Sequence, residues 1–204
     1  GTQGAEGRFE TKPAIATQLT YEINGGEYIF AVSYMDLEFD YLSTPAEKQL
    51  AFPLNDSASH IQPLMASAQY NGEKFTLTGE YQVRWNTFGR FAPFGGKFLT
   101  ESWYVEGSYR ILPELQATVR YDTVSVDKDD RAGNGAQQFG FPGHVTYAKD
   151  WVFGLRWDIT PSWMVRGEYH RVHGTAWLPQ ADNPLVAKDV QDWDLYALQL
   201  SFKF

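Results

Sequence analysis

Hydrophobic and polar residues alternate along most of this 204-residue chain. The clearest run covers residues 74–85, where odd positions are aromatic, aliphatic or Gly and even positions are Lys, Thr, Glu, Gln or Arg. A strict period of two over about a dozen residues predicts a β-strand with a different environment on each face. Comparable runs cover residues 15–23, 28–34, 60–70, 103–111, 115–121, 151–159, 163–169 and 196–204. The pattern predicts an all-β chain with about nine strands and no helix.

The connections between these runs are short and long in turn. Short turns fall at Asn24, Asn71, Pro113 and Pro161, and the first of them, Asn24 with Gly25 and Gly26, is a tight hairpin signal. Long polar connections are expected near residues 43–59, 88–98, 127–146 and 177–191. This sorting is typical of an antiparallel transmembrane β-barrel, which has short periplasmic turns and longer external loops. Pro63 weakens the run at 60–70, because proline cannot donate to a ladder.

Counting strands back from the C-terminus places the start of the first run on the external side. Bacterial single-chain barrels have an even number of strands and periplasmic ends. Residues 1–204 are therefore expected to be one barrel domain or barrel segment, the C-terminal part of a larger barrel, with residues 1–12 as an external loop or N-terminal extension. A complete barrel of about 8 or 10 strands is the alternative, reached if the count is off by one.

Composition supports a membrane barrel without requiring one. Aromatic residues make up 16% of the chain, although its mean hydropathy is −0.40 and 21% of its residues are charged. A barrel reconciles these values, because half of each strand faces lipid and half faces water; a soluble β-sandwich or lectin-like domain is the alternative. Aromatic residues near predicted strand ends would form girdles at the membrane interface: Trp85, Trp103, Tyr121, Trp151, Trp163, Tyr169 and Phe204.

The polar faces of the strands carry acidic and basic residues in pairs. If these faces line a water-filled pore, the charged residues set its selectivity. The expected pore-lining residues are Glu80, Arg84, Glu106, Arg110, Arg120, Asp122, Arg156, Asp158, Arg166 and Glu168. The five arginines of this set could form an anion pathway; alternatively, each acid neutralises its basic neighbour and the pairs brace the barrel interior.

The last strand resembles the C-terminal strand of porin-type outer-membrane proteins of Gram-negative bacteria. Phe204, Phe202, Leu200 and Leu198 match the family's alternating apolar pattern with a terminal aromatic residue, whereas Gln199 stands where the family often has a small residue. The resemblance implies that Phe202 and Phe204 are an assembly signal read by the barrel-assembly machinery. It also implies a location in the outer membrane, contact with outer-membrane lipid, passive passage of small hydrophilic solutes or ions, and homo-oligomers such as the trimers of many porins.

Other kinds of site have little support in the sequence. The net charge of −8 argues against a nucleic-acid partner, and the chain has no cysteine. The carboxylates of residues 127–135 resemble a calcium loop, but Lys128 and Arg131 interrupt them. His170 and His173 fall on opposite faces of a strand, and no catalytic or nucleotide-binding motif is found. We expect no enzyme activity, metal or cofactor.

The alternatives to a channel are a non-conducting barrel, acting as an adhesin, a scaffold or a secretion component, and a soluble lectin-like domain.

Overall fold

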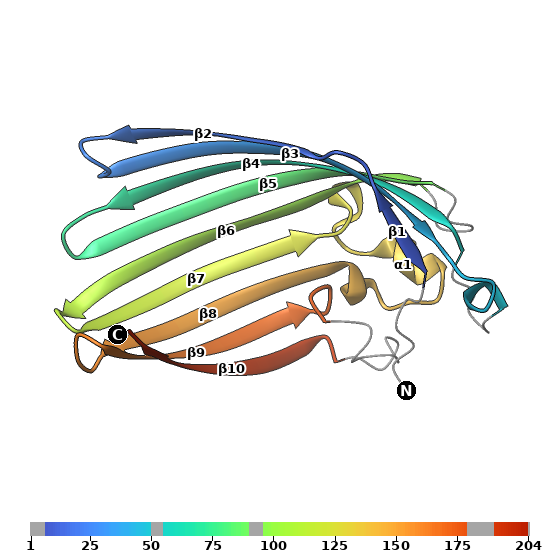
Figure 1. The fold of residues 1–204 in the computed structure, drawn as a ribbon. Coiled ribbons are helices and arrows are strands. Elements are labelled where there is room, and N and C mark those ends of the chain that lie inside the picture. Colours follow the sequence, from blue (N-terminus) through green and yellow to red (C-terminus); the bar gives the residue numbers. More distant parts are fainter. Residues whose placement is uncertain (1–6, 50–54, 90–95, 179–189, 204) are drawn as a thin grey trace.

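The computed structural model describes residues 7–49, 55–89, 96–178 and 190–203. These residues form a single antiparallel sheet in which neighbours in sequence are neighbours in space (Figure 1). The all-β prediction is therefore confirmed. The strands are β1 (Arg8–Thr11), β2 (Ile15–Ile23), β3 (Tyr28–Leu42), β4 (Ser57–Asn71), β5 (Phe75–Gly89), β6 (Gly96–Leu112), β7 (Leu115–Ser125), β8 (Tyr147–Asp158), β9 (Trp163–Gly174) and β10 (Asp192–Phe202).

Strands β1 and β2 share one position in the sheet, because both pair with β3. The short break between β1 and β2 contains Pro13, which has no N–H to donate. The Lys12 N–H in this break still donates to the Glu38 carbonyl at 3.1 Å. The described sheet thus has nine strand positions, as the hydrophobic pattern predicts. Within residues 1–12, expected as a loop or extension, Arg8–Thr11 is instead a strand that continues the β2 ladder along β3, and residues 1–6 lie outside the described residues.

Strand β4 is longer than its sequence pattern indicates. It runs through Pro63 and begins at Ser57, inside the stretch 43–59 that was expected to be a loop. The pairs Tyr34–Leu64 and Leu37–Ile61 with β3 keep one register, and the pairing lapses only between them, where Pro63 lies. Local loss of one donor is tolerated because long ladders hold the strand on both sides.

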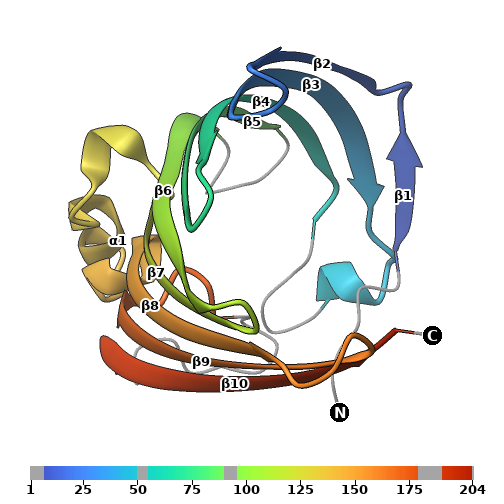
Figure 2. The ribbon, with the colours of Figure 1, turned by 90° about the vertical axis from the view of Figure 1, so that its left-hand side faces the viewer.

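The sheet curls into an open arc of barrel wall, with β1 and β2 at one edge and β10 at the other (Figure 2). Every residue of β2 and nearly every residue of β10 is exposed on both faces, as expected of strands with one free edge. The two edge strands run in the same direction, because they are the first and last of nine antiparallel positions. Closing the arc with antiparallel pairing would therefore need an odd number of further strands.

Short helices occur in the connections, which corrects the expectation of none. They are η1 (Glu47–Gln49), η2 (Lys128–Asp130), α1 (Asn134–Gln138) and η3 (Gly143–Thr146). The last three lie together on the convex side of the arc, beyond β6, β7 and β8 (Figure 2). Segments this short carry no strong periodicity, so the alternation analysis could not detect them. No helix in the described part of the chain is long and apolar enough to cross a membrane.

The described residues contain almost no apolar core. Only Tyr41, Ala148, Val152 and Val172 are buried hydrophobic residues, whereas large hydrophobic side chains are exposed along every long strand. Burial of apolar surface is the main driving force of folding in water, so a soluble β-sandwich would place these side chains inside. Here they point outward, which is the arrangement of a sheet that is covered by lipid.

Candidate functional site

The convex face carries an aromatic belt part-way along the strands. Trp103 contacts Tyr121 with ring centroids 5.5 Å apart, Tyr121 contacts Trp151 at 4.8 Å, and Tyr169 contacts Tyr196 at 5.2 Å. These rings were expected near strand ends, but Trp103 lies in the middle of β6. The strands extend beyond the belt toward the long connections. There the convex face is polar and carries ion pairs such as Arg171–Asp194.

A second group of aromatic contacts lies toward the short turns. Tyr28 packs on Tyr70 at 5.1 Å, and Trp163 packs on Phe202 at 4.6 Å. Between the two groups the convex face is aliphatic and aromatic, with exposed residues such as Val119 and Leu155. Two aromatic girdles that flank an apolar band are the outer surface of a transmembrane β-barrel. Phe204, the other residue of the expected assembly signal, lies outside the described residues.

Three of the five charge pairs expected on the concave face are formed. Arg120 binds Asp122 with both oxygens 2.8 Å from Nε, Arg156 binds Asp158 at 2.9 Å, and Arg166 binds Glu168 at 2.5 Å. Each pair joins residues two apart on one strand, so both side chains share a face. Mutual neutralisation, the alternative interpretation of these residues, therefore holds for these three pairs.

The other two expected pairs are not brought together. Among the described residues, Glu80 and Arg84 make no ion pair, and the Arg84 guanidinium donates to the Thr100 hydroxyl at 3.4 Å. Glu106 lies directly opposite Arg120 rather than against Arg110, and Arg110 lies opposite Gln116 near the turn and is exposed. Spacing within one strand could not predict these positions, because cross-strand register decides them.

The register also places like charges side by side. Asp122 on β7 lies opposite Asp150 on β8, and Arg156 on β8 lies opposite Arg166 on β9. Like charges directly opposite each other are unfavourable. Each of the two aspartates has its own partner instead: Asp122 pairs with Arg120, and Asp150 hydrogen-bonds His170, with a His170 Nδ1 to Asp150 Oδ2 distance of 2.6 Å.

Sequence reasoning missed several residues of the concave face. Asp150 is only 4% exposed and follows the same alternation as Val152 and Arg156, so extending the β8 pattern by two residues would have found it. His170 was separated correctly from His173: His170 binds Asp150 on the concave side, and His173 binds Asp192. Trp177 could not be predicted as a residue of the concave face, because it lies in the connection after β9, where no alternation applies.

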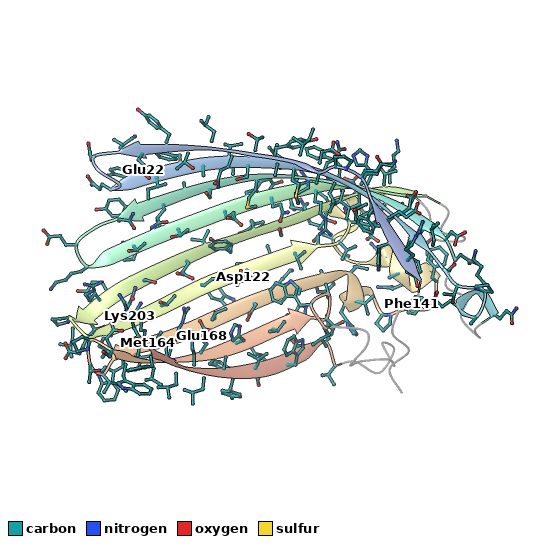
Figure 3. The ribbon with its side chains drawn as sticks, in the orientation of Figure 1. Glu22, Asp122, Phe141, Met164, Glu168 and Lys203 are labelled. Atoms are coloured by element: carbon teal, nitrogen blue, oxygen red, sulfur yellow. The ribbon has the colours of Figure 1, made fainter. Side chains whose placement is uncertain are left out.

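Two adjoining hollows lie against the concave face, with volumes of about 280 and 260 Å³. Asp122 borders both hollows, and Glu168 borders the second; both side chains point into the curve of the sheet (Figure 3). Trp177 also borders both hollows and is the one described lining residue that does not come from a strand. The hollows therefore meet at Trp177 and are walled by β5 to β9.

A tightly fixed turn carries Trp177. Gly174 has a φ of +102°, and a Cβ there would lie 2.2 Å from the Tyr147 carbonyl oxygen. Buried Thr175 donates its N–H to the His144 carbonyl at 2.8 Å, and the Ala176 N–H donates to the Tyr147 carbonyl at 3.2 Å. Glycine at 174 is thus required for the chain to leave β9 in this direction.

The acidic loop after β7 uses its carboxylates on its own backbone. Asp127 accepts the Asp129 N–H, and Asp130 accepts the N–H groups of Gly135 at 2.6 Å and Asn134 at 2.9 Å. The backbone donor of Gly135, followed by that of Asn134, holds the pKa of Asp130 below its usual range. No group of three His, Cys, Asp or Glu in the described segments is arranged to hold a metal ion.

The comparison with known families agrees with this geometry. The family described as "TonB dependent receptor-like, beta-barrel" matches residues 4–186. This chain belongs to that family. The chain is also similar in fold to the outer membrane channel DcaP of Acinetobacter baumannii, with a TM-score of 0.61 and 14% identity over 100% of the chain. It spans 55% of the length of the DcaP chain. No curated protein matches the chain.

Membership of the TonB dependent receptor-like barrel family places the chain in the outer membrane, as predicted. The described arc is a part of a larger barrel, which agrees with its two free edges. Barrels of the TonB dependent receptor-like family are receptors rather than enzymes, which agrees with the expectation of no enzyme activity.

Proposed function

We propose that this barrel lets small hydrophilic solutes cross the outer membrane through the space inside its curved sheet. The observation that carries the proposal is the opposite character of the two faces: the convex face is an apolar band with aromatic girdles, and the concave face is polar and charged. Water and polar solutes are stable only against the second face. Outer-membrane lipid is then the partner of the convex face, and the barrel-assembly machinery would insert the chain, with Phe202 and Phe204 as its signal.

The residues that would line the path are those of the concave face. They are Glu80, Arg84, Glu106, Arg110, Arg120, Asp122, Arg156, Asp158, Arg166 and Glu168, to which we add Asp150, His170 and Trp177. Because three arginines are already neutralised by carboxylates, we propose weak overall charge selectivity rather than an anion pathway. We also propose that the barrel forms homo-oligomers, as the resemblance to porins implies.

Conductance of the intact protein in planar lipid bilayers tests the channel. Stepwise currents in the absence of any energy source are expected for passive passage. A protein that is correctly inserted, as judged by heat-modifiable migration on a gel, but carries no current would overturn the proposal and favour a non-conducting adhesin, scaffold or secretion barrel.

The second candidate is receptor-type active transport, which the family match favours. A receptor of this kind would bind its solute tightly from the external side and would release it only when energy is supplied. Solute uptake into liposomes that contain the intact protein separates the two modes: uptake without energy supports the channel, and binding without uptake supports the receptor.

A further inference from the structure

We infer that the two hollows beside Trp177 form one binding site for a neutral sugar of one or two rings. The inference rests on the proposed function and names the class of solute. Trp177 offers an accessible aromatic side chain, 41% exposed, that borders both hollows. Indole rings pack against apolar faces and keep a polar N–H at the edge, which suits the C–H face of a sugar ring.

The opposite wall supplies hydrogen-bonding groups in fixed positions. In the Arg120–Asp122 pair, the arginine side chain is 40% exposed and the aspartate 10%; in the Arg166–Glu168 pair the values are 40% and 24%. The two arginine side chains are thus accessible from the hollow, and the less exposed carboxylates fix their orientation. Planar, pre-oriented donors with acceptors beside them match the neighbouring hydroxyls of a sugar.

The charge balance of the wall argues against a free ion as the preferred ligand. Arg120 binds Asp122 and also faces Glu106 directly across the β6–β7 ladder. An anion that approached Arg120 would meet two carboxylates. A cation would meet Arg120 and Arg166 in the same wall, and it would find Asp122 and Asp150 largely covered. A neutral molecule gains the same hydrogen bonds without this repulsion.

The geometry is also pre-organised. The turn that carries Trp177 is held by Gly174 and by the buried Thr175, and the ring of Tyr104 is fixed under Arg120 with 4.5 Å between the guanidinium carbon and the ring centroid. Little conformational freedom remains to be lost on binding. Hollows of about 280 and 260 Å³ are at the small end of ligand sites, which limits each to a single small ring.

Titration of the intact protein with sugars tests the inference. The probes are glucose, maltose and maltotriose, with glucuronate and glucosamine as charged molecules of the same ring type, and the readouts are block of the bilayer current and quenching of tryptophan fluorescence. We expect the neutral sugars to act at lower concentrations than their charged counterparts. Stronger action of glucuronate, or no response to any neutral sugar, would overturn the inference.

Variants locate the site. Trp177→Ala should weaken glucose binding by about tenfold or more, and Trp177→Phe should retain part of it. Trp157→Ala, the same substitution on the lipid-facing side, is the matched control and should leave the sugar response unchanged. Equal effects of the two alanine variants would overturn the assignment. Fluorescence titration does not depend on current, so sugar binding by a non-conducting protein would refute the proposed channel and leave the sugar site standing.

Discussion

Asp122 of β7 and Asp150 of β8 lie directly opposite each other on the concave face, although both are largely buried. Two carboxylates in this arrangement repel each other unless each has its own counter-charge or hydrogen-bond donor. Arg120 holds Asp122 through both oxygens, and His170 lies 2.6 Å from Asp150. Each carboxylate therefore has its own partner, Arg120 on the same strand for Asp122 and His170 on the neighbouring strand for Asp150, and these contacts constrain how the charged residues can take part in transport.

Removing the Arg120 guanidinium should destabilise the barrel. Arg120→Met keeps the aliphatic stem but leaves Asp122 facing Asp150 without its guanidinium, so we expect a loss of about 1–3 kcal/mol in the free energy of unfolding. The measurement is urea unfolding of the intact protein in lipid, followed by gel migration. Adding Asp122→Asn removes the repulsion and should restore most of the loss; an equally unstable double variant would contradict this account.

The convex face should reject charge while the concave face accepts it. Val119 and Thr118 are neighbours on β7 that face opposite sides. Val119→Arg puts a guanidinium in the apolar band and should cost about 2–4 kcal/mol. Thr118→Arg, the matched control, enters the hollow near Glu106 and Glu168 and should cost much less. Equal destabilisation of the two variants in lipid would mean that the convex face is not covered by membrane.

The turn that carries Trp177 should depend on glycine at 174. Gly174→Ala forces a Cβ against the Tyr147 carbonyl oxygen at a φ of +102°, so we expect the segment to shift and the emission of Trp177 to change. Gly167→Ala on the same strand has open space around its Cβ and serves as control. The measurement is tryptophan emission in the Trp177→Phe background and without it. A Gly174→Ala spectrum identical to the unmodified protein's would argue against the tight turn.

The loop after β7 should loosen in acid. Because the folded-state pKa of Asp130 is lowered, its contribution to loop stability is complete above the ordinary aspartate pKa of about 3.9 and disappears as the pH falls through the lowered value. Protection of residues 127–146 against hydrogen exchange, relative to the rate of an unstructured peptide at the same pH, should therefore be high at neutral pH and fall in strong acid. Asp130→Asn should accelerate this exchange already at neutral pH.

Asp129 provides the control for that experiment. Its carboxylate neighbours Asp130 in η2 but accepts no hydrogen bond among the described contacts, so Asp129→Asn should leave exchange of the loop unchanged. Comparable acceleration in both variants would show that general charge, rather than the bonds from Gly135 and Asn134, orders the loop.

Alternation along the chain was sufficient to predict the architecture. The period of two places Val119 outside and Thr118 inside before any contact is known, because successive side chains on a strand point to opposite faces. The same rule separated His170 from His173 and identified the ten charged residues, which lie in pairs on the five consecutive strands β5 to β9. It failed for β1 and α1, since stretches of four or five residues are too short to show a period.

What the sequence by itself determined is therefore the all-β fold, the polarity of its two faces and the alternation of short and long connections, because these depend only on local spacing. The tertiary structure alone decided which charges meet. The opposition of Asp122 to Asp150 is set by the register between strands, and the arrival of Trp177 at the two hollows is set by a turn at Gly174 that packs on Tyr147. Both depend on residues distant in the chain, so no local pattern could have revealed them.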